Sequence, residues 1–303
     1  MSDKNSSCPR NFPSAADDAE RARQSRAHAE LLTSASYRLA YDDQDFMLRD
    51  EMRPMRLMLE LSKPELVMSE HGIDHTVVMF GSSRVCDLER AQAEVAQLEC
   101  ECQLNDVPNP MLDQALKKAR TALEYAQYYE QARKLAGMIS ARSQDFAVNG
   151  FKCLHVITGG GPGIMEAANR GAKEAGGKTV GLNIVLPHEQ HPNAYIDPEL
   201  CFRFHYFAMR KMHFLMRARA IIAFPGGFGT LDELFETLTL VQTQKIRPLP
   251  ILLFGEQFWR KLINFDFLLD QGLIDAADLD SFCFVETAEE AWQKIAEGLG
   301  REA

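Results

Sequence analysis

Short apolar segments recur along this chain, each followed by a turn and then by residues typical of helices. From residue 75 onward the segments lie at 76–80, 153–158, 179–183, 201–206, 220–224, 249–254 and 282–285. Short, nearly continuous apolar strands that alternate with helices are typical of a parallel sheet covered on both faces. The pattern predicts an α/β fold, a Rossmann-like doubly wound parallel sheet with a helical N-terminal extension and a helical insertion.

The extension is expected to cover residues 1–75 and the main domain residues 76–303. Residues 1 to about 20 have the composition of a disordered segment, and residues 21–75 that of helices broken at Pro54 and Pro64. Met and Leu at helical spacing in this part predict packing on the main domain or on a partner subunit. A methionine-lined ligand pocket is the alternative.

The insertion is expected at about residues 85–125, where Ala, Glu, Gln and Leu predominate on both sides of the sequence NDVPNP. Prolines and asparagines are typical of turns, so the two halves predict a helical hairpin. A coiled-coil arm is the alternative, but the segment holds few heptads.

Composition excludes several classes of partner. The chain has 303 residues and a net charge of −10 without a long basic block, which argues against binding to nucleic acid. Its longest apolar runs have the length of strands, so no membrane span is expected. The N-terminus lacks the apolar core of a signal peptide, and the seven scattered cysteines fit reduced thiols. A cytoplasmic protein is expected.

Three turns that follow apolar strands are candidates for binding an anion. They read FGSSR at 80–84, TGGGPGIMEAANRGA at 158–172 and PGGFGTLDE at 225–233. In an open parallel sheet such turns gather at the carboxyl edge, where ligands bind at the switch in strand order. Glycine allows backbone N–H groups to approach an anion, and a helix N-terminus adds partial positive charge. Plain structural turns are the alternative.

The turns differ from two common nucleotide motifs. The P-loop lysine is absent, and so is a GxGxxG with an acid about twenty residues further on, which argues against an ATPase and a dehydrogenase. The sequences PGGFGTLDE, MRKMHFLM (209–216) and TGGGPGIMEAA (158–168) together resemble the LOG ("Lonely Guy") family. Its members are cytokinin riboside 5′-monophosphate phosphoribohydrolases, relatives cleave AMP or other nucleoside monophosphates, and many are mislabelled lysine decarboxylases.

The resemblance runs from about residue 76 to 255, apart from the insertion, and assigns residues one by one. Arg210 and Lys211 stand at the Arg-Lys pair of the family. The remaining matched positions form the two glycine motifs, Gly226, Gly227, Gly229, Thr230 and Glu233 in one and Gly159, Gly160, Gly161 and Gly163 in the other. The chain departs from shorter members in its extension, its insertion and residues 185–200, which puts the preferred base in doubt.

The resemblance implies hydrolysis of the N-glycosidic bond of a nucleoside 5′-monophosphate, a cytokinin ribotide or AMP. A carboxylate can stabilise the oxocarbenium-like transition state and activate water, and Glu233 is the candidate. Arg210 is assigned to catalysis or positioning and Lys211 to substrate binding, although a solvated lysine is the alternative. Phosphate is expected on the amides of Gly226 to Thr230.

Further residues are assigned from their positions. Ser82 and Ser83 can donate to the phosphate or cap a helix, and Glu166 can face the base or ribose. Phe207, Met209 and Met165 can wall the base or belong to the core. His188 and His191 lie three residues apart, but the expected reaction needs no metal, and neither metal nor cofactor is expected.

Two functions from different classes remain open. The first is the nucleoside 5′-monophosphate phosphoribohydrolase, which acts on a cytokinin ribotide or, as an AMP nucleosidase, on AMP. The second is a non-catalytic nucleotide-binding sensor whose extension is the output surface. The resemblance also implies at least a homodimer, with a higher homo-oligomer open.

Overall fold

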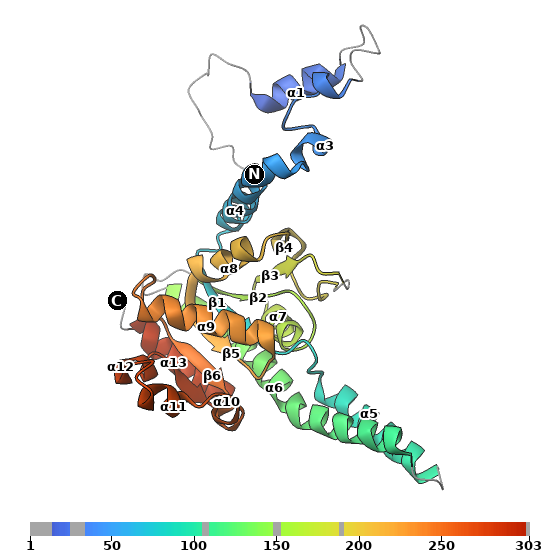
Figure 1. The fold of residues 1–303 in the computed structure, drawn as a ribbon, viewed down its shortest axis with the longest axis vertical. Helices are drawn as coiled ribbons and strands as arrows, with labels where there is room; N and C mark the ends of the chain where they lie inside the picture. The colour runs from blue at the N-terminus through green and yellow to red at the C-terminus, as the bar shows by residue number, and fades with distance from the viewer. Residues whose placement is uncertain (1–13, 25–33, 105–108, 148–152, 188–190, 301–303) are drawn as a thin grey trace. The chain divides into compact units, whose positions relative to one another are not determined.

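The computed structural model describes residues 14–24, 34–104, 109–147, 153–187 and 191–300 (Figure 1). The chain divides into two compact units, Met1–Leu59 and Glu60–Ala303. The predicted division at residue 75 stays a proposal. The first unit holds α1 (Ala15–Gln24), η1 (Ala35–Tyr37), α3 (Gln44–Met47), η2 (Asp50–Met52) and the beginning of α4 (Arg53–Glu70).

The second unit is built on one seven-stranded sheet in which every pairing is parallel. Its strands are β1 (His75–Phe80), β2 (Leu154–Thr158), β3 (Thr179–Ile184), β4 (Cys201–Phe204), β5 (Ala218–Ala223), β6 (Ile251–Phe254) and β7 (Cys283–Val285). Their order is β4-β3-β2-β1-β5-β6-β7. The chain moves outward from β1 to β4 and then returns to β5 beside β1, so the switch point lies between β1 and β5.

The helices of the second unit cover both faces of this sheet. They are α5 (Leu88–Leu104), α6 (Pro110–Ala147), α7 (Ile164–Glu174), α8 (Phe207–Met216), α9 (Phe228–Gln242), α10 (Glu256–Leu262), α11 (Phe265–Asp270), α12 (Ala276–Leu279) and α13 (Ala288–Gly300), with η3 (Pro198–Leu200) before β4. Val77 and Met79 pack with α6, α7 and α13. Val78 and Phe80 pack with α4 and α8 on the other face. Neighbouring strand residues thus enter opposite cores, which confirms the predicted doubly wound sheet.

All seven predicted strands are confirmed, with ends that move by one or two residues. The expected disorder of residues 1 to about 20 is wrong from residue 15 onward, because α1 begins there. The Ser14 hydroxyl accepts the Asp17 N–H, which caps this helix. Residues 1–13 lie outside the described part of the chain.

The predicted break at Pro64 is also wrong, because α4 continues through it to Glu70. Proline removes the N–H that would bond the carbonyl oxygen of residue 60. That oxygen lies 2.9 Å from Nε2 of the buried His213 on α8, which replaces the missing donor. Pro54, in contrast, lies in the first turn of α4, where an absent N–H removes no helical hydrogen bond.

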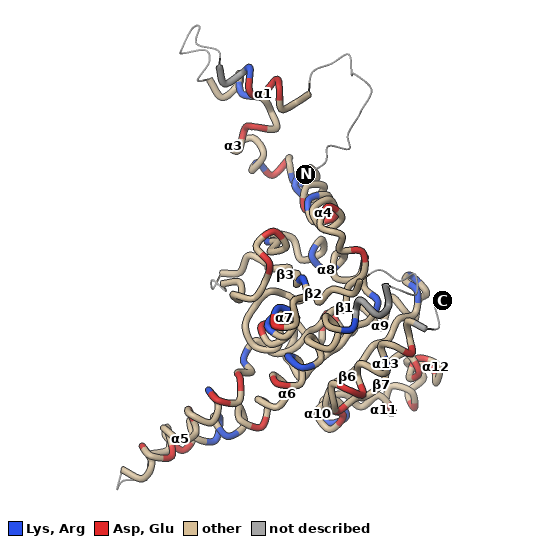
Figure 2. The backbone as a smooth tube through the Cα atoms, turned by 180° about the vertical axis from the view of Figure 1, so that it is seen from behind, with Lys and Arg blue, Asp and Glu red and all other residues tan. Residues whose placement is uncertain are grey.

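The insertion is a helical hairpin, as predicted. Helices α5 and α6 lie side by side and project from the sheet (Figure 1). Acidic and basic residues occur along both helices (Figure 2). Helix α6 continues past the expected end near residue 125 to Ala147, where it covers β2 and packs on α7, so the hairpin arm and the crossover helix are one helix. The predicted bounds of the insertion stay a prediction. The turn at 105–108 lies outside the described residues. Within the described part of the chain, no helix is both long enough and apolar enough to cross a membrane.

The crossing of α6 and α7 supplies a stability prediction. A Cβ atom on Gly171 of α7 would overlap the backbone carbonyl of Arg133, whereas one on Gly137 of α6 would lie 3.4 Å from the Gly171 carbonyl oxygen. We expect Gly171→Ala to lower the free energy of unfolding by about 2 kcal/mol or more, because two helix backbones must separate. The matched control Gly137→Ala is expected to be neutral or stabilising by up to about 1 kcal/mol. Urea denaturation measures both, and equal effects would contradict this packing.

Candidate functional site

A cavity of about 650 Å³ lies at the switch point between β1 and β5. Its wall combines the turns after these strands with Gly159 after β2 and with residues of α7, α8, α9 and α10. It is lined by Phe80, Gly81, Ser82, Ser83, Arg84, Gly159, Met165, Phe207, Arg210, Gly226, Gly227, Phe228, Gly229, Thr230, Leu231, Asp232, Glu233, Phe258 and Leu262. The volume is in the range of small-molecule sites, and the place is where doubly wound sheets bind ligands.

The N-terminus of α9 supplies the anion-binding part of this cavity. Gly227 is the N-cap, and the N–H groups of the first helical turn have no partner within the helix. A Cβ on Gly227 or Gly229 would meet open space, which leaves these amides accessible. Gly226 has another reason to lack a side chain, since a Cβ there would overlap the Thr230 hydroxyl. This turn can bind a phosphate through backbone amides and the helix dipole.

The turn after β1 faces this helix N-terminus. The Ser82 N–H donates to the Pro225 carbonyl over 3.0 Å, and the Ser82 carbonyl accepts the Ile164 N–H over 3.1 Å. Its hydroxyl accepts the Arg84 N–H at 3.1 Å and therefore also caps its own turn. Ser82 and Ser83 both line the cavity, and their predicted role in phosphate binding stays a prediction.

The first glycine turn contributes only one predicted residue to the cavity wall. Gly159 lines the cavity, and a Cβ on it would lie 2.6 Å from an Arg210 guanidinium nitrogen. Its neighbours support the loop instead. Asn183 leaves no room for a side chain on Gly160, the Gly161 carbonyl accepts from Asn193 at 3.0 Å, and Gly163 has φ +73° at the N-cap of α7.

Glu233 lies one turn into α9 and is 9% exposed. Burial raises the pKa of its carboxyl to about 7, although the positive charges of Lys211 and Arg210 oppose this rise. A carboxyl group that exchanges its proton near neutral pH suits general acid–base chemistry. It faces the same cavity as the free amides at the start of α9.

Arg210 reaches the cavity from α8. Its guanidinium lies 5.3 Å from the centre of the Phe214 ring, and its Nε is buried without a hydrogen-bond partner among the described residues. Burial lowers the pKa of Arg210, and the charge of Glu233 opposes that change. A buried cation with an unused donor at a cavity wall is suited to an anionic or polar ligand group.

Lys211 does not line this cavity, although the sequence placed it in substrate binding. Its Nζ lies 2.9 Å from Asp232, 3.7 Å from Glu233 and 2.8 Å from Glu236, all on α9. Burial opposes the charged amine, but hydrogen bonds to Glu236 and Asp232 outweigh burial and raise its pKa. Arg210 and Lys211 are successive helical residues and therefore point in directions about 100° apart. In this geometry Lys211 neutralises the acids around Glu233.

Glu166 is likewise outside the cavity lining. Its carboxylate accepts the hydroxyl of Tyr129 at 3.0 Å, so it joins α7 to α6. Of the three residues predicted to wall the base, Phe207 and Met165 line the cavity, whereas Met209 packs in the core beneath β3 and α8.

Several lining residues were missed in the sequence. Arg84 lines the cavity and directly follows Ser82 and Ser83, so its position in the sequence could have indicated that it belongs to the site. Phe228 is 92% exposed at the start of α9, inside the PGGFG motif. Phe258 and Leu262 come from α10, and no motif marked them. No group of three His, Cys, Asp or Glu suited to a metal occurs in the described residues, and His188 lies outside them.

The site is that of a doubly wound α/β protein in which a helix N-terminus suited to an anion lies beside one buried acid. A family model described as "Possible lysine decarboxylase" matches residues 165–295. The chain is 30% identical over 146 residues to the probable cytokinin riboside 5′-monophosphate phosphoribohydrolase LOG4 of Oryza sativa subsp. japonica, covering 47% of this chain and 62% of that protein. It is 27% identical to LOG3 of Arabidopsis thaliana, covering 47% and 66%. These matches confirm the resemblance to the LOG family.

The matches to these two relatives each span less than two thirds of the relative. The family-model match, residues 165–295, contains Arg210, the PGGFG turn and Glu233. Among solved structures, the molybdenum cofactor carrier protein MCP of Chlamydomonas reinhardtii is 17% identical, with a TM-score of 0.41 over 75% of this chain and 99% of that one.

The raised pKa of Glu233 predicts a pH-dependent stability. Between pH 4.5 and about 7 the folded state holds a proton that the unfolded chain releases, so rising pH destabilises the fold across this window. Below pH 4.5 we expect Glu233→Gln and wild type to have the same free energy of unfolding. Above pH 7 we expect the free energy of unfolding of the variant to exceed that of wild type by up to roughly 3 kcal/mol. Denaturant titrations at pH 4.5, 6 and 8 measure this. Glu297→Gln, an exposed glutamate of α13, is the matched control. A difference in free energy of unfolding between wild type and Glu233→Gln that stays constant across pH would contradict the raised pKa of the buried Glu233.

Proposed function

We propose that this chain hydrolyses the N-glycosidic bond of a nucleoside 5′-monophosphate and releases the free base and ribose 5-phosphate. The observation that carries the proposal is the position of Glu233, whose buried carboxyl shares one cavity with the free amides that begin α9. A helix N-terminus suited to a phosphate and an acid in one small cavity suit a substrate with an anionic end and a reactive carbon a few bonds away.

The residues divide the work of this reaction. The amides from Gly227 to Thr230 hold the 5′-phosphate, because a helix N-terminus favours an anion. Glu233, once ionised, orients and deprotonates water while its charge stabilises the oxocarbenium-like anomeric carbon. As the bond from carbon to base nitrogen breaks, water oxygen bonds to that carbon, and the departing base takes a proton. Arg210 positions the sugar or the carboxylate through its unused donor.

The family supports this reaction at the level of class. The curated relatives are named cytokinin riboside 5′-monophosphate phosphoribohydrolases, one of these three as a probable one. The preferred base, cytokinin or adenine, is left to experiment, because the family-model match at residues 165–295 includes neither the extension nor the hairpin. The predicted cytoplasmic location stays a proposal.

The test is incubation with AMP and with isopentenyladenosine monophosphate, followed by chromatography of the free base. We expect turnover by wild type and a loss of a hundredfold or more in Glu233→Gln, the scale of removing a general base, with nucleotide affinity retained. Glu297→Gln serves again as the control. Equal turnover in wild type and Glu233→Gln would remove Glu233 from the mechanism.

The second candidate is a nucleotide-binding module without turnover. The same geometry would hold a nucleotide as a signal, and the first unit would be the output surface. In that case no base appears from any monophosphate, and Glu233→Gln changes nothing measurable in binding.

We also propose a homodimer, as the resemblance implies. A surface cavity between α8 and α9 is lined by Met212, Met216, Leu240 and Ile246, and the two methionines are 46% and 48% exposed. Exposed apolar patches of this kind often bind another subunit. Light scattering is expected to give a dimer for wild type and a smaller species for Met212→Glu. Monomeric wild-type protein would refute the assembly.

A further inference from the structure

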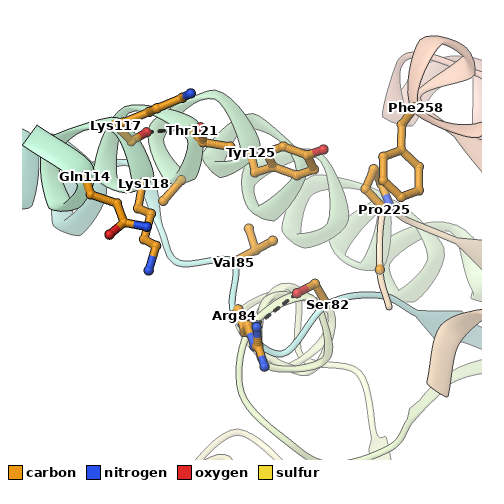
Figure 3. Close-up of a pocket in the computed structure, with 12 residues that line it drawn as sticks. Ser82, Arg84, Val85, Gln114, Lys117, Lys118, Thr121, Tyr125, Pro225 and Phe258 are labelled. Atoms are coloured by element: carbon orange, nitrogen blue, oxygen red, sulfur yellow. Dashed lines mark hydrogen bonds between the residues drawn. The ribbon is translucent and has the colours of Figure 1, made fainter. Parts of the chain in front are cut away.

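A second cavity, of about 760 Å³, lies between the helical hairpin and the turns of the candidate site (Figure 3). One side of its wall comes from α6, through residues from Gln114 to Tyr125, and the other from the turns after β1 and β5. Ser82, Arg84, Gly226 and Phe258 line both cavities, so the two are contiguous.

The chemistry of the second cavity differs from that of the rest of the chain. Its twelve lining residues include three cations, Arg84, Lys117 and Lys118, and no acid, although the whole chain carries a net charge of −10. No ion pair joins these cations to another residue in the described part of the chain. In Figure 3, Lys118 extends from α6 toward the side on which Arg84 lies, and the Lys117 amine extends to the opposite side of the helix. Unpaired cations without acids in a concave surface attract an anion.

The order of groups along the two cavities identifies that anion. Glu233 lines only the first cavity, Lys118 lines only the second, and Gly226 at the start of α9 lines both. A nucleotide whose anomeric carbon lies at Glu233 and whose 5′-phosphate lies at α9 therefore points its phosphate end toward Lys118. A group attached beyond that phosphate would enter the second cavity.

We propose that the second cavity is a subsite for a second phosphate, so that the chain binds nucleoside 5′-diphosphates or pyrophosphate-linked nucleotides more tightly than monophosphates. This rests on the proposed function for the placement of the first phosphate. Lys118 and Arg84 supply the charge, and Gln114, beside Lys118, adds an amide donor. The aromatic side chains of Tyr125 and Phe258, with ring centres 6.3 Å apart, line the same cavity. The hairpin thus acts as a specificity element.

The test compares the dissociation constants of AMP and ADP by calorimetry, in a Glu233→Gln background so that no ligand is consumed. We expect ADP to bind about tenfold more tightly than AMP at low salt, the scale of one or two charge-assisted contacts. Lys118→Glu is expected to abolish this preference without changing the affinity for AMP, and Lys118→Ala to reduce it. Lys63→Glu, an exposed lysine of α4 outside both cavities, is the matched control and should retain it.

Equal affinity for AMP and ADP in the parent protein, or a preference that survives Lys118→Glu, would overturn the subsite. A failure of the proposed function can be told apart from a failure of the subsite, because the function is tested separately by measuring whether wild-type protein releases the free base. A protein that binds ADP through Lys118 but cleaves no monophosphate keeps the subsite and loses the activity. A protein that cleaves AMP but binds AMP and ADP equally well keeps the activity and loses the subsite.

Discussion

The backbone of Ser82 joins the three glycine-bearing turns on which the site depends. Its N–H donates to the Pro225 carbonyl before α9, and its carbonyl accepts the Ile164 N–H at the start of α7. Gly163 must lack a side chain here, since a Cβ would overlap that carbonyl. Adjacent parallel strands bring the turns to one edge, but these two bonds fix their spacing. A phosphate site made of amides needs such fixed spacing, because backbone donors cannot change rotamer to find a ligand.

The charges of the site follow from that fixed backbone. Glu233 is buried because α9 begins immediately after the turn and packs its first turns against the sheet. Burial raises the pKa of this carboxyl to about 7, and the nearby cations Lys211 and Arg210 oppose the rise. Lys211 can do this from outside the cavity because Asp232 and Glu236 hold its amine in place. Lys211 therefore lowers the pKa of Glu233 from outside the cavity lining, and the cavity itself stays free for a ligand.

The sequence was sufficient for the sheet and for the turns that meet at its edge, and insufficient for side-chain direction. Apolar strands and glycine turns have local signatures, so every strand and the PGGFG turn were found. Lys211 has the same motif assignment as Arg210, but successive helical residues point apart, and only packing shows which one reaches the cavity. Pro64 has a strong local preference to end a helix, and a distant ring, His213, overrides it by bonding the freed carbonyl. Contacts between residues far apart in the sequence have no local sequence pattern, so these features could not be predicted.

The hairpin changes what an acidic protein can bind. The first cavity contains two cations, Arg84 and Arg210, and two acids, Asp232 and Glu233, so its attraction for an anion comes largely from the amides of α9. Amides at one helix end act over the first turn only, and solvent screens charges beyond about 8 Å at physiological salt. A longer polyanion would leave that range and meet the net negative charge of the chain. Lys118 of α6 lines the adjoining second cavity, so α6 extends the positive potential beyond the first phosphate of the proposed ligand. An insertion far from the motif in sequence thereby becomes part of the binding site in space.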